Sequence, residues 1–220
     1  MRIISGTSRG RKLATPKDLS LRPTSDRVKE SIFNILRGQI EGRAVLDLFA
    51  GTGNLGIEAL SRGAKKVVFV EKGKAALRLI QRNVAQFGLA ERSEVLPIDA
   101  SRAIGVLKRR KILFDLIFMD PPYEQGLIER TLTKLNSHPI HHKDSVLVIE
   151  HHRRELLSAA ASGWDLIRQR QMGQTVVSIL TPQQGEASTE PTGGPEHAFP
   201  ACWRDTKREY SNGEKQERRG

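Results

Sequence analysis

Residues 44–56 read AVLDLFAGTGNLG, a short apolar run that passes directly into glycines spaced as G-x-G-x-x-G. An apolar run of this length predicts a strand that is buried on both faces. Gly51 and Gly53 allow a tight turn and a close approach of the backbone to a ligand, and a helix from Ile57 to Arg62 would then present unpaired N–H groups. The pattern predicts a strand–turn–helix unit for a nucleoside-type ligand, a pattern that dinucleotide-binding enzymes share.

The strand–helix alternation continues along the chain. An α/β fold with a mostly parallel, Rossmann-like sheet and right-handed crossovers is therefore predicted. An antiparallel hairpin around residues 172–173 would complete it, after a polar loop at 136–143. The predicted strands are 66–71, 93–98, 114–119, 145–150, 164–170 and 175–180, and the predicted helices are 26–37, 74–87, 100–108, 127–135 and 153–160.

Acidic residues lie at or near the ends of the first four predicted strands, namely Asp47, Glu71, Asp99 and Asp120. If these strands are parallel, the four carboxylates meet at one edge of the sheet, where open α/β sheets bind ligands. A helix cap alone could explain Asp99, and a surface position could explain Glu71. Four carboxylates at equivalent positions favour a bound nucleoside-type cofactor instead.

A second motif, Asp120-Pro121-Pro122-Tyr123, follows the strand predicted at 114–119. No helix can begin there, because proline lacks an N–H and restricts the residue before it. The Asp120 carboxylate and the Pro121 carbonyl could each accept one N–H of an exocyclic amine on a nucleobase, which localises and aims its lone pair. Tyr123 offers a face for a flipped base. The alternative is an ordinary proline-rich turn, so the motif depends on the rest of an alkylation site.

Composition favours a nucleic-acid partner. The net charge is +11, and residues 182–220 hold 6 Lys and Arg against 7 Asp and Glu, so residues 1–181 carry +12. Such a basic excess favours a polyanion. No apolar run approaches the length of a membrane span, no secretory signal is evident, and the single Cys202 excludes an internal disulfide. We expect a cytoplasmic protein.

The basic excess is densest at the N-terminus. Residues 1–24 read as a short β ribbon in which glycines accompany cations, before a helix capped by Thr24 or Ser25. We expect RNA contacts there rather than a merely solvated surface. The candidate RNA-binding residues are Arg9, Arg11, Lys12, Arg22 and Arg27.

Two further features are interpreted conservatively. The histidines between residues 138 and 152 have neither Cys partners nor an i,i+4 pair on one helix, so we expect no metal site. From residue 182 the composition turns to Gly, Pro, Glu, Gln, Ser and Thr without hydrophobic periodicity, which predicts a disordered tail over 182–220. Residues 25–181 would then form the main domain.

Several stretches of this sequence resemble a known family. DLFAGTG at 47–53 and DPPY at 120–123 look like the class I S-adenosylmethionine-dependent amino-methyltransferases. MRIISG at 1–6, RGRKL at 9–13 and LRPTSDRVKE at 21–30 narrow the resemblance to the RsmD-like bacterial enzymes, which methylate N2 of one guanine in 16S ribosomal RNA. The resemblance covers residues 1–181, and the tail departs from it.

The resemblance implies a seven-stranded sheet whose last strand is antiparallel, S-adenosylmethionine as cofactor and no essential metal. It implies 16S ribosomal RNA or an assembling small subunit as partner of a monomeric enzyme. Asp47 and the glycine turn would approach the methionine part of the cofactor, Glu71 the ribose and Asp99 the adenine amino group. The implied cofactor-binding residues are Asp47, Phe49, Gly51, Gly53, Glu71, Asp99 and Ala100, and the implied catalytic residues are Asp120, Pro121, Pro122 and Tyr123.

Two other functions compete with this one. An amino-methyltransferase acting on adenine N6 of DNA, or on another RNA, would share the DPPY motif, although 220 residues leave little room for a large target-recognition domain. A catalytically silent RNA-binding assembly factor would be expected to carry damaged motifs, whereas Gly51, Gly53 and Asp120 are intact. A dehydrogenase would explain neither Asp120 nor the basic excess.

Overall fold

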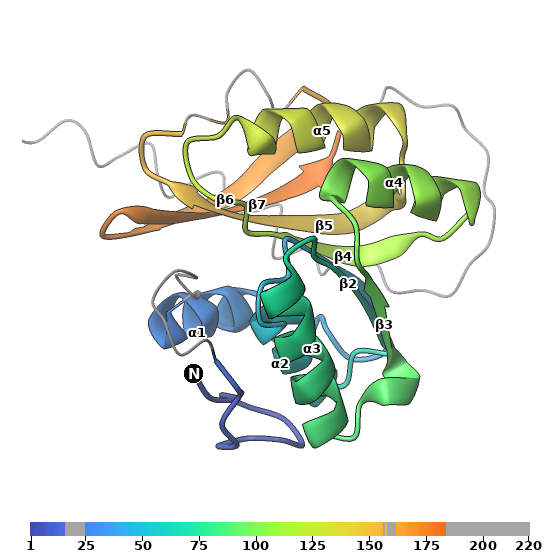
Figure 1. Ribbon diagram of the computed structural model, residues 1–220. Coiled ribbons are helices and arrows are strands. Elements are labelled where there is room, and N and C mark those ends of the chain that lie inside the picture. The colour runs from blue at the N-terminus through green and yellow to red at the C-terminus, as the bar shows by residue number, and fades with distance from the viewer. Residues whose placement is uncertain (16–24, 156, 158–161, 184–220) are drawn as a thin grey trace, which may run out of the picture. The chain divides into compact units, whose positions relative to one another are not determined.

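A computed structural model describes residues 1–15, 25–155, 157 and 162–183, which belong to one compact unit, Met1–Gln183 (Figure 1). Arg22, Thr24, the tail from residue 184 onward and half of the helix predicted at 153–160 lie outside the described residues. Within those ranges, no helix is long and apolar enough to cross a membrane.

A seven-stranded sheet forms the centre of the unit, in the order β3-β2-β1-β4-β5-β7-β6. The first five strands run parallel, and β7 is antiparallel to both of its neighbours, which confirms the predicted fold. The strands are β1 (Ala44–Leu48), β2 (Lys66–Val70), β3 (Ser93–Leu96), β4 (Phe114–Met119), β5 (His141–His152), β6 (Trp164–Met172) and β7 (Thr175–Pro182).

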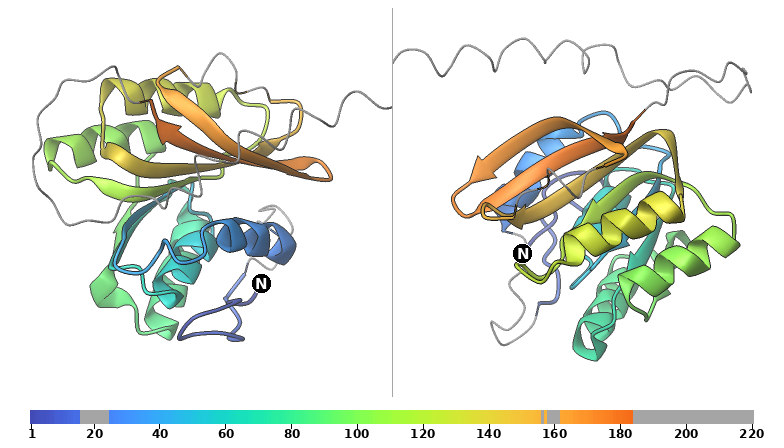
Figure 2. Two further views of the ribbon diagram at one scale, coloured as in Figure 1. Left: turned by 180° about the vertical axis from the view of Figure 1, so that it is seen from behind. Right: turned by 90° about the horizontal axis from the view of Figure 1, so that it is seen from above.

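Helices cover both faces of the sheet, because the central strands are apolar on both sides (Figures 1 and 2). On one face α4 and α5 contribute Ile104, Leu107, Leu132 and Leu135 to a core with alternate strand residues. On the other face lie α1, α2 and α3, and the ring of Phe33 on α1 lies 5.7 Å from that of Phe118 on β4. The helices are α1 (Asp26–Ile35), α2 (Asn54–Ser61), α3 (Lys74–Gln86), the short 3₁₀ helix η1 (Ala90–Arg92), α4 (Ala100–Arg109) and α5 (Leu127–Ser137).

The N-terminal residues form a narrow ribbon with one antiparallel bridge, Arg2 to Lys12. It packs against α2, where the Glu58 carboxylate accepts the N–H groups of Ile4 (2.8 Å) and Ser5 (3.0 Å). The side chain of Asn83 on α3 accepts the N–H of Ala14 at 2.7 Å. Side chains of the main fold thus satisfy the backbone of a ribbon that is too short to stabilise itself.

Two predicted element starts differ from the structure by three residues or more. The second helix begins at Asn54, not at Ile57, because Gly53 takes the left-handed conformation (φ 80°) and starts the helix directly. Strand β5 begins at His141, inside the predicted loop 136–143. Its polar residues have partners on β4: His142 Nε2 lies 3.2 Å from Asp115 Oδ1, and the Ser145 hydroxyl donates to the Phe114 carbonyl at 2.8 Å.

The described residues of the segment predicted as a helix at 153–160 are not helical. Arg153 N–H instead donates to the Gln174 carbonyl at 2.9 Å, and the Glu155 carboxylate accepts the N–H of His152 at 3.0 Å. The backbone after β5 is therefore held by the β6–β7 turn and by a local side-chain bond, so it has no need of helical hydrogen bonds.

Candidate functional site

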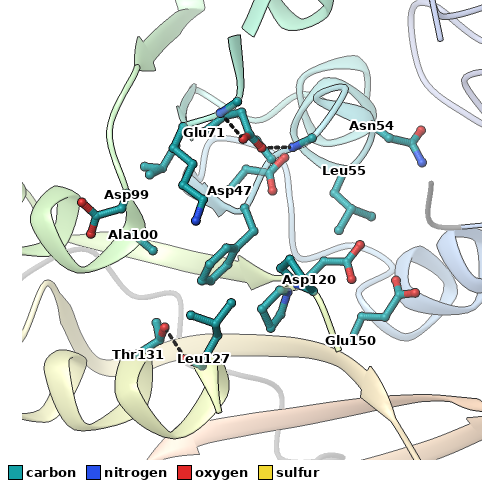
Figure 3. Close-up of a pocket in the computed structure, with 18 of the residues that line it drawn as sticks. Asp47, Asn54, Leu55, Glu71, Asp99, Ala100, Asp120, Leu127, Thr131 and Glu150 are labelled. Atoms are coloured by element: carbon teal, nitrogen blue, oxygen red, sulfur yellow. Dashed lines mark hydrogen bonds between the residues drawn. The ribbon is translucent and has the colours of Figure 1, made fainter. Parts of the chain in front are cut away.

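A pocket of about 880 Å³ opens at the carboxyl ends of the parallel strands (Figure 3). Strand order reverses between β1 and β4, and this switch point is where ligands bind in open α/β sheets. The pocket is lined both by the turn after β1 and by the turn after β4. The two sequence motifs therefore face one cavity.

The glycine turn is held against the end of β2 by the Glu71 carboxylate. Glu71 accepts the N–H of Gly51 at 2.9 Å and the N–H of Gly73 at 2.7 Å, one bond to each carboxylate oxygen. Gly51 has φ of 54°, and a Cβ there would meet nothing within 4 Å. The backbone at Gly51 therefore borders open space in the pocket, next to the Glu71 carboxylate, which is a hydrogen-bond acceptor. Polar groups of a ligand would need both.

Asp47 lies at the base of the pocket and is 2% exposed. Burial raises the pKa of its carboxyl group to about 8, against the lowering effect of the N–H of Gly56, and Asp120 and Glu71 raise it further. That N–H lies 2.9 Å from Asp47 Oδ2. The acidic pocket would therefore favour a ligand that brings positive charge to Asp47.

The other residues expected at the cofactor divide into two groups. Phe49, Asp99 and Ala100 line the pocket, and Gly53 is not among its lining residues. Gly53 instead lies at the start of α2, where a Cβ would come within 3.2 Å of Ile57 and 3.4 Å of Phe69. Asp99 lines the pocket and also caps α4, because its carboxylate accepts the N–H of Arg102 at 3.0 Å.

All four residues of the DPPY motif line the pocket. No helix follows them until Leu127, as the two prolines predicted. Hydrogen bonds fix the Tyr123 hydroxyl, which donates to Glu150 Oε1 at 3.3 Å and lies 3.3 Å from the hydroxyl oxygen of Thr175. The tyrosine ring is thus held at the carboxyl end of β5 rather than left to rotate.

None of the candidate RNA-binding cations that the structure describes lines the pocket. Arg9, Lys12 and Arg27 are exposed. Arg11 is also exposed, but its guanidinium donates to the Gln86 carbonyl at 2.7 Å and lies over the Phe87 ring at 4.4 Å. Among the described residues there is also no cluster of His, Cys, Asp and Glu that could hold a metal ion.

The structure adds residues to the pocket and its surroundings that the sequence motifs do not include. Glu150 and Thr175 line the pocket. Glu150 ends a predicted strand, so the same sequence pattern that marks the four other carboxylates also marks Glu150. Lys29 stands among the charged residues of its helix in the sequence, yet it is fully buried with Glu58, 3.4 Å from its carboxylate. Lys29 also donates to Asn54 Oδ1 at 2.7 Å, and Asn54 lines the pocket.

Comparisons with known proteins identify the family. Residues 1–181 match the family described as Conserved hypothetical protein 95. The chain is 38% identical over 179 residues to the "Putative rRNA methyltransferase YlbH" of Bacillus subtilis, which covers 81% of this chain and 97% of that protein. It is 33% identical over 191 residues to the "Ribosomal RNA small subunit methyltransferase D" of Escherichia coli, which covers 86% of this chain and 94% of that protein.

The fold agrees with this match. The solved structure of yhhF from Escherichia coli has a TM-score of 0.73 to this chain at 30% identity and covers 84% of this chain and 99% of that one. The resemblance seen in the sequence is confirmed over the same residues. The chain belongs to the RsmD/YlbH family of S-adenosylmethionine-dependent rRNA methyltransferases.

Proposed function

We propose that this protein transfers a methyl group from S-adenosylmethionine to the exocyclic N2 of one guanine in small-subunit (16S) ribosomal RNA. The observation that carries the proposal is the shared pocket, which places the glycine turn with Glu71 and the Asp120-Pro121-Pro122-Tyr123 turn around one cavity. An alkylation site needs such an arrangement, because donor and acceptor must meet in a fixed geometry.

The residues on the β1 and β2 side fit the cofactor. Glu71 has lone pairs beyond its two backbone bonds, so it can accept from ribose hydroxyls. Asp47 would lie near the positively charged methionine part, and Asp99 and Ala100 would lie at the adenine. When bound, the cofactor supplies an electrophilic sulfonium methyl group, and the protein's task is alignment.

The residues on the β4 side would hold the base. Asp120 and the Pro121 carbonyl would each accept one N–H of the guanine N2 amine, so that its lone pair points at the methyl group. The amine loses one proton once the new N–C bond has formed, and Asp120 lies on that side of the pocket to accept it or pass it to water. Tyr123 would pack on the base, and Pro122 would keep the turn rigid.

The relatives support the choice of RNA. The protein of Escherichia coli is named as a small-subunit rRNA methyltransferase, and residues 1–181 of this chain carry a charge of +12. The test is mass spectrometry of nucleosides from 16S rRNA of cells with and without the gene. We expect one N2-methylguanosine per 16S rRNA to be lost with the gene and restored by the wild-type gene. Unchanged N2-methylguanosine would refute the proposal, and loss of N6-methyladenosine from DNA or RNA would assign another amine.

A further inference from the structure

Glu150 is a further pocket carboxylate, and it lies on the strand next to the one that leads to Asp120. Strands β4 and β5 are parallel, and their last register pair is Met119 with Ile149, so Asp120, which directly follows β4, and Glu150 on β5 are the next residues along the two chain segments. Neighbouring strands lie ~4.8 Å apart, and paired residues project from the same face of a sheet. In Figure 3 both carboxylates point to the side of the pocket where Asn54 and Leu55 lie.

Glu150 is held in this position. It is 4% exposed, and the Tyr123 hydroxyl donates to its Oε1 at 3.3 Å. An ionised carboxylate has about four lone-pair sites, so a donor from a bound base can be accepted beside the bond from Tyr123. The turn that would hold the reacting amine is thus tied to a neighbouring acceptor.

The two carboxylates match one nucleobase better than the others. In guanine the N2 amine lies next to N1–H, so two donors stand side by side on the base edge. In adenine and cytosine the ring nitrogen next to the amine is an acceptor, which a carboxylate would repel. Enzymes that extrude a base identify it by hydrogen bonds to this edge.

We propose that Glu150 is the specificity-determining residue for guanine, accepting the N1–H while Asp120 and the Pro121 carbonyl accept the N2 amine; this assignment rests on the proposed function. A buried acceptor left facing another acceptor loses its hydrogen bond, and sites of this kind reject the wrong ligand strongly. Glu150 would therefore affect which base is methylated, and it would affect the affinity for the cofactor less.

The test uses 2-aminopurine, which keeps the reacting amine but has an acceptor at N1. The guanine methylated by the wild-type enzyme is mapped first in a small-subunit particle. The particle's RNA is then remade by ligation with guanine or 2-aminopurine at that position. We expect the wild type to prefer guanine in kcat/KM by at least about a hundredfold and Glu150→Gln to shrink this preference by at least about tenfold, because an amide can face either an N1–H or an N1 acceptor.

Tyr123→Phe is the matched control, because it removes the hydrogen bond from Tyr123 to Glu150 but leaves the Glu150 carboxylate in place. It should slow both substrates by a similar factor and keep the preference for guanine. Calorimetric binding of S-adenosylmethionine verifies that both variants are folded. If the wild type methylates guanine and Glu150→Gln keeps the same preference for guanine, the role of Glu150 is overturned but the proposed function is not. The same holds if Tyr123→Phe shrinks the preference as much as Glu150→Gln does. No wild-type transfer to guanine would overturn the proposed function.

Discussion

At the scale of single residues, the proposed chemistry depends most on Asp120. Asp120→Asn keeps the size of the side chain but can turn an N–H donor toward the amine that must be held. Loss of a well-placed charged acceptor costs ~3 kcal/mol in the transition state, or roughly a hundredfold or more in rate. The rate of single-turnover methylation of a particle containing 16S rRNA measures this loss. Calorimetry should find the cofactor affinity of the variant nearly unchanged. Wild-type turnover by this variant would refute the proposed role.

A second prediction at this scale concerns the proton on Asp47. With a pKa of about 8, this carboxyl group is protonated at neutral pH in the free protein. A positively charged methionine moiety favours the ionised form, so cofactor binding should release a proton below pH 8. Between pH 6 and 7.5 the association constant should rise with pH, by up to about tenfold per unit.

Asp47→Asn is the control for this linkage, since its amide oxygen can still accept the N–H of Gly56. Its association constant should stay nearly flat between pH 6 and 7, where the ligand's own amino group, with an ordinary pKa of about 8, remains mostly charged. Calorimetry in two buffers of different ionisation enthalpy counts the protons released. Equal pH dependence in the two proteins would show that Asp47 is already ionised or lies away from the bound charge.

At the scale of elements, the buried pair Lys29–Glu58 joins three parts of the chain. Lys29 on α1 donates to the Arg2 carbonyl of the ribbon at 2.6 Å and to Asn54 at the start of α2 at 2.7 Å. Burial lowers the pKa of Lys29, and Glu58 opposes this effect. The pair fixes how the ribbon and α1 lie against α2. Ser25 at the start of α1 and Asn54 at the start of α2 both line the pocket.

Breaking a buried pair by removing one partner is costly, so Lys29→Met should destabilise the protein by ~3 kcal/mol. We expect the low end of the usual range, because Glu58 keeps Arg62 at 2.8 Å and two backbone donors. Lys66→Met is the matched control: its side chain is 50% exposed and paired with Glu94, so the loss should stay below ~1 kcal/mol. Urea unfolding measures both, and equal losses would contradict the structural role of Lys29.

At the scale of the whole molecule, the positive charge of residues 1–181 should drive RNA binding. Neutralising Arg9, Arg11, Lys12 and Arg22 to Gln should weaken binding and lower the slope of log K against log salt by up to ~3, since each phosphate contact contributes ~0.7–0.9. Arg11 should contribute least, because Gln86 and Phe87 already engage it. Cofactor affinity should not change.

The matched control neutralises Lys108, Arg109, Arg110 and Lys111, exposed cations at the end of α4. Helix α4 begins at the pocket, so its last turn lies toward the opposite edge of the sheet. Filter binding across a salt series compares the two variants. An equal reduction of slope in both would mean that net charge alone, and not the ribbon, attracts the RNA.

Local residue patterns predict the sheet and the two halves of the candidate pocket. Strand–glycine–helix order and the two prolines after Asp120 are local signals, because backbone geometry and buried strands depend on neighbouring residues. The carboxyl ends of parallel strands must share an edge, so Asp47, Glu71, Asp99 and Asp120 were brought together by topology alone. Boundaries were less well predicted, as α2 and β5 show.

Which polar residues become buried partners depends on packing between distant parts of the chain. Lys29 reads as a surface lysine in its helix, and its burial depends on Glu58, 29 residues away in the chain, and on the Arg2 carbonyl. Glu150 acquires its place beside Asp120 from the register of β4 and β5, and its bond from Tyr123 joins the turn after β4 to strand β5. A buried charge is stable only with partners, and partners distant in sequence are set by packing, which local residue patterns do not record.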